Sequence, residues 1–175
     1  MFSPRWRRAV VVALVAVLLF GVATVRLFIL PATNAPAKVD AIVMLDGNMT
    51  HERRDRAIEL ARVGYAPVLV VSTPHGKKCP VNAVPTVRVI CFDPEPVTTQ
   101  GEARGTAELA SRYGWKTILV VASRQQDTRA RIRFERCYND RVLVDVVTPR
   151  LRDWPYLIAY EWGALGKAMI LQRGC

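Results

Sequence analysis

Two stretches with one shared pattern, ELARVGYAPVLVVS at residues 59–72 and ELASRYGWKTILVVAS at residues 108–123, decide the fold of this chain. Each runs from the end of a helical pattern, through a glycine and an aromatic residue, into an apolar run that ends in serine. Continuous apolar runs of this length are typical of strands buried on both faces, as in parallel sheets covered by helices. The repeated helix–strand unit therefore predicts an α/β domain.

The flanking sequence extends this pattern in both directions. Further strands are predicted within residues 39–48, 86–91 and 141–149, and further helices within residues 51–64, 124–137 and 153–171. The order of these elements predicts a three-layer, Rossmann-like α/β domain with a mostly parallel sheet of about five strands.

The first thirty residues have a different composition. Arg5, Arg7 and Arg8 precede an unbroken apolar stretch from Ala9 to Val25. About twenty apolar residues cross a bilayer, and basic residues in front of them place the N-terminus in the cytoplasm. The sequence therefore predicts a basic N-terminus and transmembrane helix over residues 1–30, a linker over 31–38, and an extracytoplasmic domain over 39–175.

A cleaved signal peptide is the alternative, because APA at residues 35–37 resembles a cleavage site. The apolar run is longer than the core of a usual signal peptide, which favours an uncleaved, single-pass anchor in the plasma membrane. In both cases the domain lies outside the cytoplasm.

The four cysteines fit that oxidising compartment, where an even number predicts two disulfides. Cys79 and Cys91 bracket a proline-containing loop and are the preferred pair, which leaves Cys137 for Cys175. Four cysteines allow three connectivities, so the other two pairings stay open. Zinc is disfavoured because the chain has two histidines and no CxxC motif.

The net charge of +10 bears on the partners. A basic domain beside a membrane favours anionic lipid or phosphorylated envelope compounds over nucleic acid. The alternative is that the bases only solvate the surface. The sequence identifies no protein partner and no cofactor.

The carboxyl ends of the predicted strands carry polar residues, and ligands of open α/β sheets bind at that edge. Hydroxyls, amides, small residues and arginine there, together with helix N-termini, suit an anionic ligand such as a phosphate. The predicted ligand-binding residues are Gly47, Asn48, Arg53, Ser72, Thr98, Thr99, Ser123, Gln126 and Arg129. Asp46 and Glu102 are the candidate catalytic acids or bases.

The segment SRQQDTRARIRFERC at residues 123–137 holds five arginines. Asp127 or Thr128 can cap its helix. Arg129, in the first turn, can reach the strand end and contact a ligand. Arg133 and Arg136 are predicted to face solvent as a basic stripe.

Motifs in a fixed order resemble those of the YdcF-like family, which includes the SanA- and ElyC-type envelope proteins. They are DAIVMLDGN, the helix from Arg53 to Gly64, VLVVS, TTQGEA, ILVVASRQQDTRA and YEWGALGKA, and they cover nearly all of residues 38–175. The paired cysteines resemble an actinobacterial-type branch. The resemblance implies a Rossmann-like domain with a polar cleft and a role in the cell envelope. The matching residues are Asp40, Gly47, Arg53, Ser72, Thr99, Glu102, Ser123 and Arg129.

Two positions depart from the family pattern. A single Gly47 replaces a glycine-rich turn, and Gln126 stands where the family usually has a histidine. Because glutamine cannot relay protons near neutral pH, this difference favours binding over catalysis, and whether the protein is an enzyme stays open.

Three functions follow as hypotheses. The first is a membrane-anchored domain that binds, and can process, a phosphorylated envelope or cell-wall precursor metabolite, including a lipid-linked phosphate. The second is a non-enzymatic module that docks on an envelope protein or anionic lipid through the arginine stripe. The third and weakest is a magnesium-dependent hydrolase that uses Asp46, Asp93, Glu95 and Glu102.

Overall fold

Five parallel strands form the sheet of this protein, for which the computed structural model describes residues 4–47 and 49–175. The strands lie in the order β3-β2-β1-β4-β5, and every neighbouring pair is parallel. Their bounds are β1 Ala41–Met44, β2 Val68–Ser72, β3 Arg88–Phe92, β4 Thr117–Ser123 and β5 Arg141–Val147. The predicted α/β fold class is confirmed.

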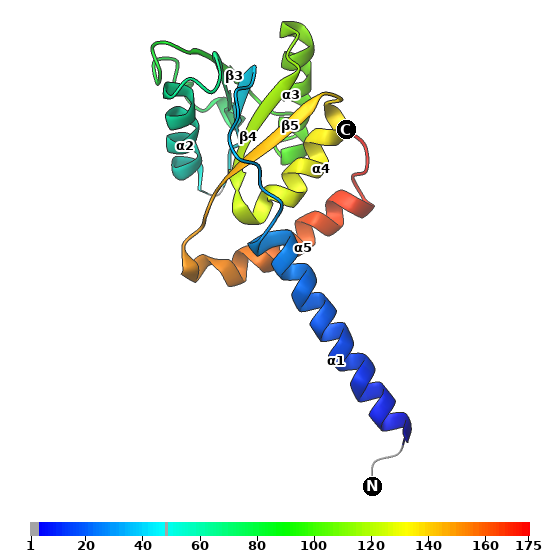
Figure 1. Cartoon of the computed structure of the whole chain (residues 1–175). Helices are drawn as coiled ribbons and strands as arrows, with labels where there is room; N and C mark the ends of the chain where they lie inside the picture. The colour runs from blue at the N-terminus through cyan, green and yellow to red at the C-terminus, as the bar shows by residue number, and fades with distance from the viewer. Residues whose placement is uncertain (1–3, 48) are drawn as a thin grey trace.

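Helices cover both faces of the sheet (Figure 1). On one face, α2 (Thr50–Arg62) buries Ala57, Leu60 and Ala61 against alternate residues of the strands. On the other face, α3 (Thr99–Tyr113) and α4 (Asp127–Cys137) form the second core cluster. Because side chains alternate across a strand, residues such as Ile42 and Val43 serve opposite cores.

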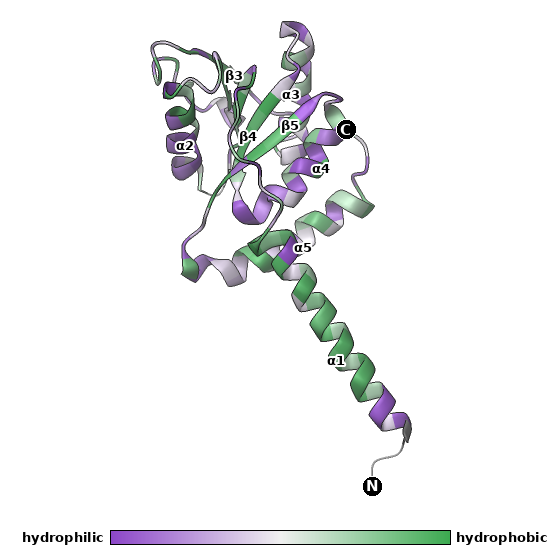
Figure 2. Cartoon of the chain, in the orientation of Figure 1, coloured by the Kyte–Doolittle hydropathy of each residue, from purple (hydrophilic) through white to green (hydrophobic). Residues whose placement is uncertain are grey.

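The N-terminal helix α1 (Pro4–Thr24) continues into a π-helical turn, η1 (Val25–Ile29), and extends away from the domain (Figures 1 and 2). The segment Arg5–Ile29, 25 residues long, is apolar enough to cross a membrane. Its last turn contacts the domain, where Phe28 is fully buried.

Helix α5 (Trp154–Ile170) follows the short turn η4 (Leu151–Asp153) and packs against α4. Its Pro155 lies in the first turn, where a proline costs no helical hydrogen bond. The turns η2 (Pro74–Gly76) and η3 (Arg124–Gln126) follow β2 and β4.

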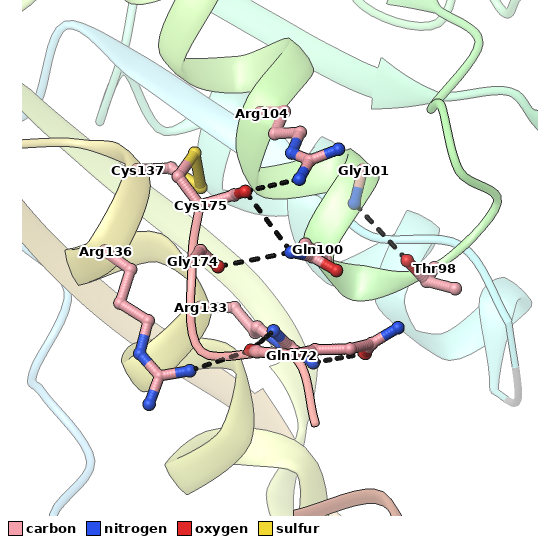
Figure 3. The surroundings of a disulfide bond; sticks show 10 residues. All are labelled: Thr98, Gln100, Gly101, Arg104, Arg133, Arg136, Cys137, Gln172, Gly174 and Cys175. Carbon is pink, nitrogen blue, oxygen red and sulfur yellow. Dashed lines mark hydrogen bonds between the residues drawn. A yellow bond between two sulfur atoms is a disulfide. The ribbon is translucent and has the colours of Figure 1, made fainter. Parts of the chain in front are cut away.

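The arginines of α4 fasten other segments to the domain, so the prediction of a solvated stripe was wrong. Arg133 is buried and donates to the backbone oxygen and side chain of Gln172. Arg136 donates to the carbonyl oxygens of Ala168 and Gln172 (Figure 3). The carbonyls of the chain's last residues have no helical partner, and the arginines supply donors for them.

The beginning of α4 also differs from the prediction. Its N-cap position is Gln126, which makes no side-chain capping bond. Asp127 pairs instead with Arg131, and the Thr128 hydroxyl donates to the carbonyl of Leu27. The turn η3 precedes the helix, so Asp127 and Thr128 lie in its first turn, where Asp127 pairs within the helix and Thr128 makes a tertiary contact.

Both preferred disulfides are present. Cys79 is joined to Cys91 beside β3, and Cys137 at the end of α4 is joined to the terminal Cys175. Gln100 and Arg104 of α3 donate to the carbonyl of Cys175 as well (Figure 3). The C-terminal tail therefore links α3, α4 and α5.

Candidate functional site

A cavity of about 230 Å³ opens at the carboxyl edge of the sheet. The turns after β1 and β4 meet there. These strands are neighbours in the sheet, but the helices that follow them, α2 and α4, pack on opposite faces. This is the switch point at which open α/β sheets bind their ligands. The lining residues are Asp46, Gly47, Arg53, Pro74, Pro94, Val97, Thr98, Glu102, Ser123, Gln125, Gln126, Arg129, Leu157, Tyr160 and Glu161.

Arg53 forms the most unusual part of this cavity. It lies in the first turn of α2 and is 1% exposed. Its Nη1 donates to Gln126 Oε1 at 2.9 Å, whereas Nε and Nη2 are buried without a hydrogen-bond partner. Burial lowers the pKa of Arg53, and the negative charges of Glu102 and Asp46 oppose that shift.

Gly47 lies against this guanidinium. Its φ of +107° belongs to the backbone region that favours glycine, and a Cβ there would lie 3.5 Å from Nη2 of Arg53. The turn after β1 therefore passes close to the arginine without covering it with a side chain.

Glu102 lies in the first turn of α3 and is 4% exposed. Its Oε1 accepts a hydrogen bond of 2.7 Å from the backbone N–H of Asp46. Burial raises the pKa of Glu102, and the Asp46 N–H, the Ser72 hydroxyl and Arg53 partly offset that rise. A carboxyl group in this setting is suited to exchange a proton.

Asp46 has a different environment. Both of its carboxylate oxygens accept from Lys77 Nζ, at 2.9 and 2.7 Å. Lys77 lies in the loop after η2, where no periodic pattern marks it, and the sequence analysis did not identify it. Because this ion pair stabilises the carboxylate, Asp46 is a weaker candidate for a base than Glu102.

Arg129 lines the cavity, but much of its guanidinium has protein partners. Nε and Nη2 bind the two carboxylate oxygens of Glu161 at 2.8 Å each, and Nη1 donates to Thr99 Oγ1 at 2.8 Å. Glu161 is 2% exposed, so this ion pair is buried. Burial opposes the charge of Arg129, yet the pair with Glu161 raises its pKa overall.

Gln126 connects the two arginine groups. Its Oε1 accepts from Arg53, and its Nε2 donates to Thr99 Oγ1 at 3.1 Å. Since arginine can only donate, these bonds fix the orientation of the amide. An amide keeps one donor and one acceptor at any pH, so the glutamine maintains this link where a histidine would titrate.

The remaining predicted residues divide into three groups. Ser123 lines the cavity, and its buried Oγ has no hydrogen-bond partner. Thr98 caps α3 by accepting from the Gly101 N–H, while Ser72 lies beside Glu102. Asn48 lies outside the described residues.

The acids proposed for magnesium do not gather. Within residues 4–47 and 49–175, no three His, Cys, Asp or Glu side chains form a group that could hold a metal. Asp93 accepts from the His75 N–H instead.

Leu157 and Tyr160 were not predicted as site residues. Both belong to α5 and line the cavity. The apolar pattern of α5 indicated a helix but not the element against which it packs, so it carried no signal for this contribution.

Comparison with known proteins adds no relative: no family model, curated protein or solved structure matches the chain. The likeness to the YdcF-like family therefore stays a prediction.

Proposed function

We propose that this protein is a membrane-anchored, extracytoplasmic domain whose cavity binds the phosphate group of an envelope or cell-wall precursor metabolite. The observation that carries the proposal is Arg53, a buried guanidinium with two unpaired nitrogens beside a polar cavity. Leaving such donors unsatisfied is costly, and a phosphate oxygen would accept from them.

The surroundings support an anion. Ser123 Oγ supplies another unpaired polar atom at the same cavity. The N-termini of α2 and α3 also lie at this edge of the sheet, and helix N-termini favour negative charge. Asp46 is ion-paired with Lys77, and Glu161 is ion-paired with Arg129. These pairs leave Arg53 as the cation of the lining whose charge a bound phosphate would neutralise.

The same cavity could process its ligand through Glu102. Its pKa is raised, and its carboxylate accepts from the backbone N–H of Asp46, whereas the carboxylate of Asp46 is ion-paired with Lys77. Glu102 is therefore the residue to which we assign any proton transfer, while Arg53 and Ser123 hold the phosphate.

The alternative of a docking module now has less support. Its proposed surface was the stripe of Arg133 and Arg136, and both side chains bind the C-terminal segment of the same chain. The cavity is the better supported site.

Arg53→Met tests the proposal, with Arg54→Met as a matched control because Arg54 is exposed on the same helix. The full chain in detergent is titrated with inorganic phosphate and then with phosphomonoesters, and the melting temperature is recorded. A ligand at a hundred times its dissociation constant stabilises the folded state by about 2.7 kcal/mol.

Wild type and Arg54→Met are expected to show this stabilisation, and Arg53→Met to lose it. Arg53 makes one hydrogen bond, to a neutral amide, and two of its nitrogens have no partner, so Arg53→Met removes a poorly satisfied buried charge and the ligand-free variant should remain folded. An equal ligand-induced shift in Arg53→Met would refute the assignment.

A further inference from the structure

The outward face of α5 is mostly apolar, with Lys167 as its one charged residue. At the spacing that places side chains on one helical face, it presents Tyr156, Tyr160, Gly163, Lys167 and Ile170. Tyr156 and Ile170 are 67% and 66% exposed. The sole acid of the helix, Glu161, is buried against Arg129. A helix that faced only water would carry more charged residues on this face.

The end of the membrane helix is fixed against this same helix. The ring of Phe20 stacks on Trp162 of α5 at 4.9 Å, and the ring of Phe28 meets it edge-on at 5.2 Å. Trp162 Nε1 also donates to Thr24 Oγ1 at 3.2 Å. Figure 1 shows α5 crossing the base of the domain where α1 leaves it. These contacts set the orientation of the domain relative to the membrane.

Counting along α1 gives the depth of α5. A hydrocarbon core of about 30 Å takes about 20 helical residues at about 1.5 Å each. Counted from Ala9, the first apolar residue after the basic cluster, that length ends at Phe28. Phe20 and Thr24 lie on the membrane side of this level. Trp162, which contacts both, therefore lies at the outer boundary of the bilayer or just below it.

We infer that the outward face of α5 lies in the outer interface of the membrane, and that the cavity receives the phosphate headgroup of a lipid in that leaflet. Tyrosine and tryptophan favour this layer, and Lys167 suits anionic headgroups. The apolar helix α1 meets α5 at the base of the domain (Figure 2), where Phe20 and Phe28 contact Trp162, so one bilayer covers both.

The cavity is connected to this face through α5 itself. Tyr160 belongs to the outward face, is 50% exposed, and also lines the cavity beside Leu157. A lipid phosphate can reach Arg53 from the interface while its chains stay in the leaflet. This second half of the inference rests on the proposed phosphate function; the position of α5 does not.

The position of α5 can be measured with spin labels on the full chain in phosphatidylcholine–phosphatidylglycerol vesicles. All four native cysteines are in disulfides, so single variants Tyr156→Cys and Ile170→Cys can be labelled without reductant. Val63→Cys is the control, because Val63 is 70% exposed and follows the far end of α2.

Labels on α5 are expected to collide more with oxygen than with an aqueous nickel chelate, and the Val63→Cys label to show the reverse. Labels on α5 that behave like the control overturn the inference. So does spin–spin broadening between copies, or shielding from both reagents, because a protein would then cover the face.

A second experiment tests whether the bound phosphate comes from a lipid or from a free compound. Ile170→Glu places a negative charge on the outward face of α5, at a residue that does not line the cavity. Two probes are compared: inorganic phosphate with the protein in detergent, and phosphatidic acid in bilayer nanodiscs. Hydrogen exchange of residues 123–127 reports occupancy of the cavity.

Ile170→Glu is expected to respond to inorganic phosphate like wild type but to need about tenfold more phosphatidic acid for half-maximal protection. Arg53→Met is expected to respond to neither probe. If Ile170→Glu matches wild type with both, the lipid inference fails and the phosphate function stands. If Arg53→Met retains both responses, the phosphate function itself fails.

Discussion

At the scale of single residues, the buried charged side chains of the site differ in how many hydrogen-bond partners they have. Arg129 has a carboxylate and a hydroxyl as partners, whereas Arg53 has one amide oxygen and two nitrogens without partners. The sequence predicted that both arginines contact a ligand. Residue type and order along the chain are the same whether an arginine is paired with an acid in the folded protein or not. Their difference follows from Glu161, which is distant in sequence and reaches only Arg129.

Breaking the Arg129–Glu161 pair should therefore destabilise the domain. The two side chains are 12% and 3% exposed, so Arg129→Gln leaves an uncompensated buried carboxylate. The expected loss is about 3–5 kcal/mol in the free energy of unfolding. The double variant Arg129→Met/Glu161→Met should recover most of that loss, as measured by pulse proteolysis in urea. A double variant as unstable as the single one would contradict this account.

Glu102 should make the stability of the domain fall as pH rises. Burial raises its pKa in the folded state above the ordinary value of 4.5, so between the two pKa values the folded state binds more protons than the unfolded state. The stabilisation is fully present below pH 4.5 and is lost as pH rises through the folded pKa.

Glu102→Gln should flatten this part of the pH profile, since its oxygen can still accept from the Asp46 N–H. Glu108→Gln, which changes an exposed residue of the same helix, should leave the profile as in wild type. Unfolding free energies measured at a series of pH values provide the comparison. Equal slopes in wild type and Glu102→Gln would exclude this role.

At the scale of elements, α4 is the helix that ties the others together. Its arginines bind the segment before β1, the end of α5 and the tail, and its last residue forms a disulfide with Cys175. A run of basic residues on a helix usually indicates a solvent-exposed face. In this helix the arginines form hydrogen bonds with other segments of the chain instead.

The two disulfides should contribute unequally to stability. The Cys137–Cys175 bridge closes 38 residues and the Cys79–Cys91 bridge closes 12. Loop-closure entropy assigns about 4 kcal/mol to the first and about 3 kcal/mol to the second. Paired Cys→Ser variants should therefore lose stability in that order in pulse proteolysis. The reverse order would show that the contacts of the tail, and not loop closure, dominate.

At the scale of the whole molecule, the end of the apolar N-terminal segment is part of the domain's packing. Phe28 is fully buried, and Asn34 in the following segment exchanges hydrogen bonds with Val144 of β5. Cleavage after residue 37 would remove both. This packing supports an uncleaved anchor over a cleaved signal peptide.

Phe28→Ala should accordingly destabilise the domain by about 3–5 kcal/mol, the usual cost of emptying a buried aromatic site. Val17→Ala, which changes a side chain of α1 that is 70% exposed, is the control and should cost much less. Intact mass of the protein extracted from membranes should include residues 1–37. Loss of those residues, with the domain still stable, would contradict the anchored arrangement.

The sequence by itself determined the layer order, the five strands, the apolar N-terminal helix that could cross a membrane, and the edge of the sheet where polar residues meet. These depend on local periodicity and on rules for parallel sheets, which act over short spans of chain. Only the tertiary structure decided which partners the charged side chains find: Lys77 pairs with Asp46, Glu161 pairs with Arg129, and the neutral Gln172 accepts from Arg133. A charge pair depends on which distant segments lie within a few ångströms of each other, and residue order does not encode that distance directly.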